Sequence, residues 1–392
     1  MKFFRALPNF ILPVLIAVFN LFILLFPGEI LKASKDGIVL WAMNILPTLL
    51  PFIIGTNILI ATGIVDLLGI FLEPLMYPLF KVPGCGAFAF ISGIISGYPI
   101  GAKITQSLRS AGKISKLQAE RLISFCNNSG PLFILGALAT SMLGNKNYGY
   151  FIMLVHYLSA IITGIIFRFV GRDKNDAPVS TRRIYFHTLG HFKSYRHDTN
   201  VGMIISKSIH DAIETVLQIG GFIVIFSIVA KMLELCNIVS LIWNCLAQFK
   251  FIYQMGYETF CGIFIGIIEM TNGAKIIAAQ NFSPNLLIAF SFLVSFGGLS
   301  VHMQSISFIS KTDIKASLYL FSKFMHAIIS AIVATILLPF FNFTAQNVAS
   351  SNYDFSFVSK IIFSLENFLL IIAIHLILIF IACISKFLRK KI

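Results

Sequence analysis

Residues 93–103 read Gly93-Ile94-Ile95-Ser96-Gly97-Tyr98-Pro99-Ile100-Gly101-Ala102-Lys103, and this stretch decides the fold. It lies in an apolar part of the chain, yet it contains three glycines, a proline and a lysine. Glycine and proline interrupt an α-helix and leave backbone N–H and C=O groups unpaired. In a membrane, such groups are tolerated only where the backbone is buried in protein or lines a cavity. The stretch therefore predicts the tip of a broken helical hairpin inside a membrane protein.

The composition indicates a chain that lies mostly within a membrane. Of the 392 residues, 57% are hydrophobic and 12% are charged, whereas a soluble domain usually carries about 25% charged residues. Apolar runs of about 20 residues, long enough to cross a bilayer as helices, recur along the chain. The formal net charge of +14 comes largely from the loops between these runs, as the positive-inside rule expects. We therefore expect an all-α polytopic membrane protein surrounded by the lipid bilayer, with no nucleic-acid partner.

The basic loops also predict how the chain crosses the membrane. With the N-terminus in the cytoplasm, residues 83–110 and 256–281 cannot cross and must return to the side from which they enter. They are predicted to form two oppositely oriented re-entrant hairpins, beside about eight transmembrane helices and two interfacial helices at 66–81 and 238–254. The C-terminus is also expected in the cytoplasm. The predicted transmembrane helices cover residues 8–26, 38–62, 117–144, 148–170, 208–235, 284–308, 315–341 and 360–386.

The two halves of the chain repeat each other weakly. Gly101-Ala102-Lys103 returns 172 residues later as Gly273-Ala274-Lys275, and Phe125–Leu132 resembles Phe292–Leu299, 167 residues later. Since the two hairpins point in opposite directions, the repeat is expected to be inverted, and inverted repeats with interrupted helices are characteristic of secondary transporters. The predicted divisions are an N-terminal transmembrane helix and loop (1–37), a first repeat (38–170), a basic cytoplasmic loop (171–207), a second, inverted repeat (208–341), and a C-terminal transmembrane helix with a basic tail (342–392).

Pro99 and Lys103 predict an anion site at the tip of the first hairpin. Proline suits the first turn of a helix, and the N-terminus of that helix directs free N–H groups and a positive dipole toward the middle of the membrane. Lys103 adds a full positive charge about one turn later, and Lys275 is its counterpart in the second hairpin. The alternative is that both lysines extend to the interface or pair with a carboxylate such as Glu269.

Polar side chains at the other interruptions extend this candidate site. Residues 127–129 (Asn-Asn-Ser) precede Gly130-Pro131, so they can satisfy the interrupted backbone, bind a ligand, or do both. Glu269 can bind a coupling cation or a substrate hydroxyl, and an ion pair with Lys275 is its alternative role. The candidate substrate-binding residues are Ser96, Tyr98, Pro99, Gly101, Lys103, Asn127, Asn128, Ser129, Gly130, Glu269, Thr271, Asn272, Lys275, Ser295, Gly297, Gly298 and Ser300.

The sequence carries no pattern that points to catalysis. It contains no H-E-x-x-H, no G-x-x-x-x-G-K-[ST] and no G-x-S-x-G motif, so we expect neither an enzyme nor ATP-driven transport. His187, His191 and His197 fall in the basic loop, where a solvated loop is expected and not a metal site. No cofactor is expected, and sodium and proton both remain open as coupling ions.

Three segments of the first half carry a family resemblance. The segments Ser96–Lys103, Ala119–Leu122 and Ser124–Ile134 resemble the YlbJ-type sporulation integral membrane proteins, which carry the nucleoside recognition or Gate domain. The Gate domain is in turn similar to the core of the concentrative nucleoside transporters, with inverted hairpins and partly unwound helices around a central site. The resemblance extends over nearly the whole chain, and it is looser in the second half.

The resemblance implies a function and a location. It implies an endospore-forming bacterium, the outer forespore membrane, and movement of dipicolinic acid, a small anionic substrate, from the mother cell toward the spore. Two alternatives stay open. One is a secondary transporter of nucleosides or other small solutes, and the other is a non-transporting membrane protein of spore assembly. The possible protein partners are further copies of this chain, in a homo-oligomer, and other sporulation membrane proteins.

Overall fold

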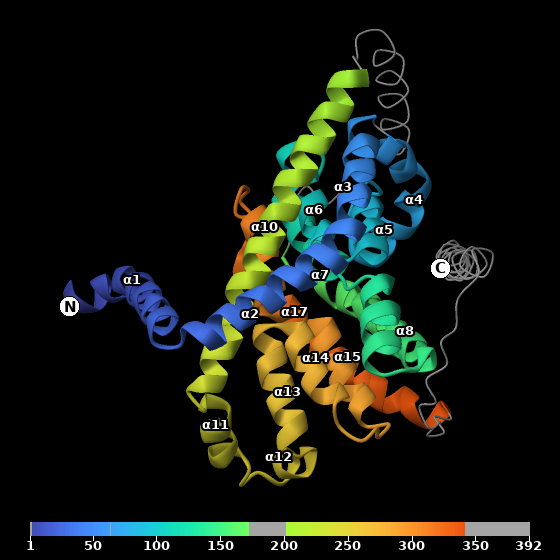
Figure 1. The fold of residues 1–392 in the computed structure, drawn as a ribbon. Helices are drawn as coiled ribbons and strands as arrows, with labels where there is room; N and C mark the ends of the chain where they lie inside the picture. The colour runs from blue at the N-terminus through green and yellow to red at the C-terminus, as the bar shows by residue number, and fades with distance from the viewer. Residues whose placement is uncertain (1, 63, 172–200, 342–392) are drawn as a thin grey trace.

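The computed structural model describes residues 2–62, 64–171 and 201–341, and within them regular structure is entirely helical (Figure 1). Residues 172–200 of the expected basic loop, the last expected transmembrane helix and the basic tail fall outside these residues, and residues 201–207, expected as the end of that loop, are helical. The helices are α1 (Lys2–Leu25), α2 (Pro27–Leu40), η1 (Trp41–Ile45), α3 (Leu46–Ala61), α4 (Ile64–Phe80), α5 (Gly86–Ser96), α6 (Ile100–Ser110), α7 (Lys116–Cys126), η2 (Leu132–Met142), α8 (Lys146–Phe167), α10 (Val201–Leu235), α11 (Ile238–Leu246), α12 (Lys250–Met255), α13 (Tyr257–Ile268), α14 (Met270–Ala278), α15 (Leu286–Phe296), α16 (Gly298–Ile309), α17 (Ala316–Leu337) and η3 (Leu338–Phe340).

The N-terminal region differs from the expected helix and loop. α1 and α2 meet at Phe26 with a bend of 108°. Pro27 begins α2, as proline does in the first turn of many helices. The segment expected as a polar loop is therefore helical, and it continues through the π-helical residues Trp41–Ile45 into α3.

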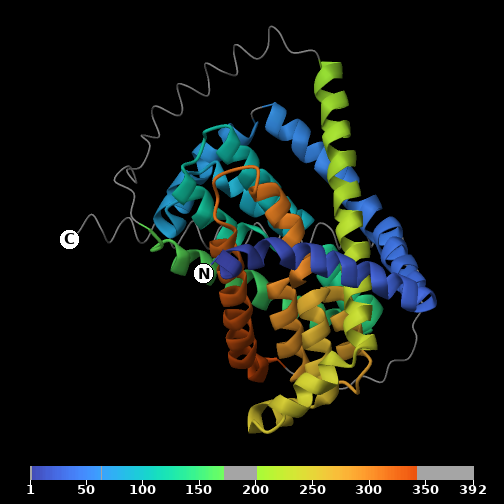
Figure 2. The same ribbon diagram turned by 90° about the vertical axis from the view of Figure 1, so that its left-hand side faces the viewer.

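The two halves place similar elements in the same order. In the first half, α3 and α4 are followed by the hairpin α5–α6, the interrupted pair α7–η2 and the long helix α8. In the second half, α10, α11 and α12 are followed by the hairpin α13–α14, the interrupted pair α15–α16 and the long helix α17. Figures 1 and 2 show the hairpin α5–α6 in the upper half of the molecule and the hairpin α13–α14 in the lower half. The long helices α8 and α17 pack against each other. The order of the elements is thus similar in the two halves, and the inversion of the second half stays a prediction.

Four described segments are long and apolar enough to cross a membrane, or five if the bent α1–α2 pair is one span. Of the other expected spans, 8–26 belongs to the bent pair, 38–62 and 117–144 contain shorter apolar helices (Leu49–Ala61 and Leu132–Met142), and 360–386 lies outside the described residues. The four segments are Lys146–Phe167, Val201–Leu235, Leu286–Ile309 and Ala316–Phe340.

One ion pair joins the two halves outside the helical core. The Arg109 side chain, at the end of α6, donates from Nε and Nη2 to the two carboxylate oxygens of Asp313, at 2.8 and 2.9 Å. These charge-assisted hydrogen bonds hold the pKa of the Asp313 carboxyl below its ordinary value. Both side chains are partly exposed, so the pair positions the loop before α17 and adds little stability.

Glycine allows hairpin one to lie directly on the interruption between α7 and η2. At Gly93 and Gly101, an added Cβ would overlap the carbonyl oxygen of Cys126. In a membrane, helices associate through close packing and hydrogen bonds, and small residues allow the backbones to approach. The glycines of residues 93–103 therefore allow close contact between helices as well as interrupting a helix.

We predict that Gly93→Ala destabilises the protein by about 3 kcal/mol, because the new methyl group meets a backbone carbonyl that has no rotamer to change. Thermal denaturation in detergent measures this effect. Gly221→Ala in α10 is the matched control, since nothing lies within 4 Å of its added Cβ. Alanine is expected there to leave the stability equal or slightly higher. Equal denaturation temperatures for the two variants would contradict the packing described.

Candidate functional site

The tip of hairpin one connects the two halves of the chain. Gly97 ends α5 with φ of +84°, a conformation that favours glycine, and Pro99 precedes α6. Between them, the Tyr98 hydroxyl lies 3.2 Å from the carbonyl oxygen of Val294 and 3.4 Å from that of Ser295. The tip therefore donates to backbone carbonyls in the last turn of α15, just before the second interrupted helix breaks.

Asn127 is the hydrogen-bonding centre of the first interruption. Its amide nitrogen donates to the hydroxyls of Ser305 in α16, at 2.8 Å, and Tyr319 in α17, at 2.9 Å. Its amide oxygen accepts from the backbone N–H of Ala102 in the first turn of α6, at 3.4 Å. The side chain is fully buried. One amide thus joins hairpin one, α16 and α17.

Side chains of α8 satisfy the backbone at the same interruption. The N–H of Ser129 donates to Nε2 of His156 at 3.0 Å, and the carbonyl of Ser129 accepts from the Tyr157 hydroxyl at 3.1 Å. The Asn128 amide nitrogen donates to the carbonyl of Phe125 at 2.7 Å, while its Oδ1 is buried without a hydrogen-bond partner. An interrupted helix is tolerated here within a membrane protein, because the interruption is buried and the backbone N–H and C=O of Ser129, which lack helical partners, bond to side chains.

Two basic side chains of α17 meet at this interruption. Nζ of Lys323 donates to the carbonyl oxygen of Asn127 at 2.8 Å and lies 2.9 Å from Nδ1 of His326. Nε2 of His326 donates to the carbonyl oxygen of His156 at 3.1 Å. Lys323 also lies over the Tyr98 ring, 5.2 Å from its centroid. Lys323 and His326 are both 0% exposed, and none of these partners is a carboxylate.

The second interrupted helix faces the first across α8. The Ser295 hydroxyl is 2.8 Å from Nδ1 of His156, and Gly297 and Gly298 both have positive φ, which allows the turn between α15 and α16. Ser300 accepts from the Gln304 side chain at 3.3 Å. His156 therefore contacts both interruptions, through one ring nitrogen each.

Hairpin two is organised by Glu269. Its carboxylate accepts from the backbone N–H groups of Thr271 and Asn272, at 3.1 and 2.8 Å, which makes it the N-terminal cap of α14. Lys275 lies on the exposed face of α14, and these two described side chains form no ion pair with each other. The cap uses both carboxylate oxygens, so Glu269 positions the start of the helix.

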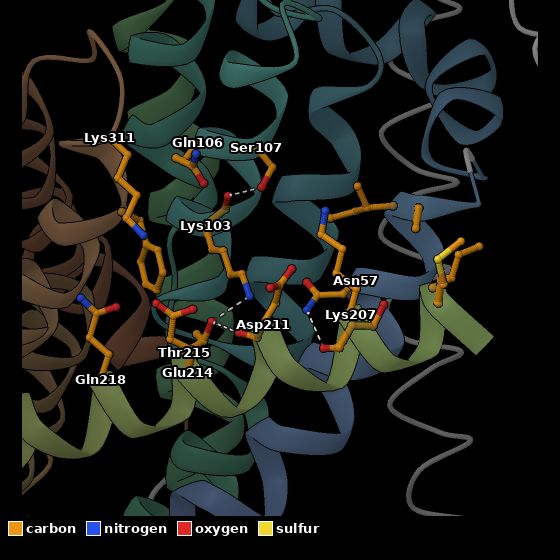
Figure 3. Close-up of a pocket in the computed structure, with 16 residues that line it drawn as sticks. Asn57, Lys103, Gln106, Ser107, Lys207, Asp211, Glu214, Thr215, Gln218 and Lys311 are labelled. Atoms are coloured by element: carbon orange, nitrogen blue, oxygen red, sulfur yellow. Dashed lines mark hydrogen bonds between the residues drawn. The ribbon is translucent and has the colours of Figure 1, made fainter. Parts of the chain in front are cut away.

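Lys103 points away from the interruptions into a cavity of about 470 Å³ between α6 and α10 (Figure 3). Its Nζ donates to the Thr215 hydroxyl at 2.8 Å. Three lysines against two carboxylates leave the lining one positive charge in excess, and uncharged polar and apolar side chains complete it. The charged lining residues are Lys103, Lys207, Asp211, Glu214 and Lys311, and the apolar ones include Ile60, Ala61, Met203, Ile204 and Phe308.

The structure thus divides the predicted site into three places. One group meets in a buried polar core, defined as the two interruptions with the tip of hairpin one and the facing side chains of α8 and α17. Lys103 lies in the lysine-lined cavity, and the Glu269 group forms the start of α14, with Lys275 exposed beside it. The predicted residues of the core are Ser96, Tyr98, Pro99, Gly101, Asn127, Asn128, Ser129, Gly130, Ser295, Gly297, Gly298 and Ser300.

Sequence reasoning missed the basic residues of this core. Lys323, His326 and His156 fall in stretches that were expected to be plain transmembrane helices. A lysine within an apolar run, three residues before a histidine, is the signal that could have identified them, because ionisable residues within the membrane are rare and usually functional.

Membrane-length helices around a buried core of interrupted helices define a polytopic helical membrane protein. Residues 42–172 match the family model described as Gate, nucleoside recognition. The chain is 32% identical over 335 residues to "Sporulation integral membrane protein YlbJ" of Bacillus subtilis (strain 168), which covers 82% of each chain. The chain therefore belongs to the YlbJ family of sporulation integral membrane proteins. No solved structure matches it.

Proposed function

We propose that this protein is a secondary transporter of a small carboxylate, with dipicolinic acid as its substrate, moved from the mother cell toward the forespore across the outer forespore membrane. The observation that carries the proposal is the lysine-lined cavity beside hairpin one. Its excess positive charge suits an anion, and its apolar side chains suit an aromatic ring. Dipicolinate is a small aromatic dianion, and about 470 Å³ is ample for it.

The arrangement of the helices supports transport over a scaffolding role. Hairpin one and the two interrupted helices meet around one polar core, and hairpin two lies in the other half of the molecule. Interrupted helices leave backbone groups that must be satisfied at depth in the membrane, and a scaffold has no need of them. In secondary transporters, such elements come from inverted repeats and rearrange around a substrate site near the midplane.

A nucleoside is the second candidate substrate, because the matching family model is described as nucleoside recognition. A nucleoside is neutral, so it has no need of Lys103. An acidic site that binds a coupling cation would then be expected at Glu269, where both carboxylate oxygens already accept from the backbone of α14. The excess positive charge of the cavity therefore favours a carboxylate over a nucleoside as the substrate.

We predict that Lys103→Met reduces the uptake of labelled dipicolinate by proteoliposomes about 10-fold to 100-fold at low substrate concentration. A charge-assisted hydrogen bond contributes about 1.5–3 kcal/mol, and each 1.4 kcal/mol corresponds to about a factor of ten. The loss is expected mainly as a higher KM, since the lysine binds substrate in the cavity.

Lys32→Met, at an exposed position of α2, is the matched control and should retain wild-type uptake. An unchanged KM for dipicolinate in Lys103→Met would show that the substrate does not bind in this cavity. Uptake of uridine by both variants provides the comparison, because a neutral substrate gains little from the lysine.

A further inference from the structure

Lys323 and His326 lie one turn apart on α17 and form a buried pair of two bases. Their nitrogen atoms, Nζ and Nδ1, are 2.9 Å apart, which is a hydrogen-bonding distance. A hydrogen bond between two nitrogens requires one proton between them. Two positive charges at this distance in a buried site would repel strongly. When the pair is charged, it therefore carries one excess proton, which either residue can hold.

The hydrogen bonds of the two histidines fix where their protons lie. Nε2 of His326 faces the carbonyl oxygen of His156, which can only accept, so Nε2 carries the hydrogen and Nδ1 is free to accept from Lys323. Nε2 of His156 accepts from the N–H of Ser129, so its Nδ1 carries the hydrogen and donates to Ser295. His156 is thus neutral, and the Lys323–His326 pair is the place in this network where a proton can be gained or lost.

Within the described part of the chain, the surroundings of the pair show no negative charge that could balance a proton. The titratable groups that face it are Tyr98 at the tip of hairpin one, Cys126 in α7, His156 and Tyr157 in α8, His302 in α16 and Tyr319 in α17. None of them is a carboxylate, and an uncompensated charge is costly to bury. An anion bound by the protein would reduce this cost, so proton binding at the pair and binding of the substrate anion should favour each other.

The pair is also attached to the elements that meet at the core. Lys323 holds the carbonyl of Asn127 at the first interruption and lies over the ring of Tyr98 at the tip of hairpin one. His326 holds the carbonyl of His156, whose ring contacts both interruptions. A change in the charge of the pair therefore acts directly on hairpin one, α7 and α8.

We propose that the Lys323–His326 pair is the binding site of a coupling proton, so that the protein moves its carboxylate substrate together with a proton. The inference rests on the proposed function, and it names the coupling ion of that transport. The substrate anion compensates the charge that the proton brings, and the pair returns to its neutral state when both leave.

The test follows protons and substrate together in proteoliposomes that contain the wild-type protein and a pH-sensitive dye, with the membrane potential clamped. Labelled dipicolinate is the probe. Its uptake is expected to acidify the interior at a fixed ratio of protons to substrate. A gradient of one pH unit should drive about tenfold accumulation if one proton accompanies each substrate. Uptake without proton movement, or accumulation driven by sodium alone, would overturn the inference.

Equilibrium exchange of labelled for unlabelled dipicolinate separates this inference from the proposed function, because exchange needs no gradient. Exchange of dipicolinate without proton movement during uptake would overturn the proposed proton coupling and leave the proposed transport of dipicolinate intact. The absence of both exchange and uptake in the wild-type protein would overturn the substrate itself, and with it the coupled step.

Two variants locate the proton. Lys323→Gln and His326→Gln keep hydrogen-bonding side chains that cannot bind a proton, and the number of protons carried per dipicolinate should fall to near zero. His210→Gln, at an exposed position of α10, should keep the wild-type ratio. A wild-type ratio in either folded core variant would overturn the assignment. Nuclear magnetic resonance of isotope-labelled histidine in the wild-type protein needs no substitution, and an unchanged His326 Nδ1 signal on adding dipicolinate and acid would also overturn it.

Discussion

Lys323→Met is expected to abolish dipicolinate transport while the stability of the protein changes little, because two effects of the substitution offset each other. Methionine has a similar length and fills the same space, but it carries no charge. Replacing a buried charged group by a well-packed apolar one is often neutral, or stabilising by about 1–4 kcal/mol, and this offsets the loss of the hydrogen bonds to the Asn127 carbonyl and to His326 Nδ1. Without Lys323 the pair binds no coupling proton, so the transported anion loses the positive charge that compensates it, which costs about 3–5 kcal/mol and therefore more than a 100-fold loss of uptake.

A large loss of transport with little change in stability distinguishes a functional lysine from a structural one. Thermal denaturation in detergent and uptake by proteoliposomes are measured on the same preparation of Lys323→Met. Lys32→Met, exposed on α2, controls for the loss of a positive charge and should match the wild type in both measurements. A variant that loses stability and still transports at the wild-type rate would show that Lys323 serves only the fold.

Asn127→Leu is expected to lower stability and transport together, by about 2–4 kcal/mol and at least tenfold. Leucine is close to asparagine in size, but it cannot donate to Ser305 and Tyr319 or accept from the N–H of Ala102. Buried polar groups left without partners cost about 1–3 kcal/mol each. The two hydroxyls keep other hydrogen bonds, which limits the loss.

The decrease is measured by thermal denaturation, and uptake is then normalised to the folded fraction. Asn20→Leu is the matched control, because the Asn20 side chain is exposed on α1 and bonds only to its own helix, at the carbonyl of Ile16. It should change stability by less than about 0.5 kcal/mol. Similar stability of the two variants would mean that Asn127 does not hold hairpin one to α16 and α17.

The interruptions of the helices were predictable from the sequence because their causes are local. Gly97 and Pro99 end one helix and begin the next, and the Asn-Asn-Ser-Gly-Pro stretch at 127–131 separates α7 from η2. The predicted hairpin at 83–110 contains α5 and α6, and the one at 256–281 contains α13 and α14. The helical conformation of residues 27–37 was not predicted, because their charged residues alone favour a loop.

The directions of the two lysines could not be predicted without the packing of their helices. A helix turns by about 100° per residue, so Lys103 lies about 200° from Gly101, the residue that contacts the α7–η2 interruption. Lys103 therefore faces α10 and the cavity. The same spacing separates Gly273, which packs on Gly262 and Gly266, from Lys275, and there it leaves the lysine exposed.

The buried basic pair escaped prediction for a different reason. Its partners Tyr98, Asn127 and His156 are distant from it in sequence, and the separation of Asn127 and Lys323 along the chain, 196 residues, gives no local pattern. Only the fold shows that the lysine meets an interrupted helix.

The most direct test of the account is the uptake of labelled dipicolinate and labelled uridine by proteoliposomes that contain the wild-type protein, beside liposomes without protein. Saturable uptake of dipicolinate, with little uptake of uridine and no competition by uridine, is the predicted result. Uptake of uridine that dipicolinate does not inhibit, with dipicolinate at the level of empty liposomes, would contradict transport of a carboxylate.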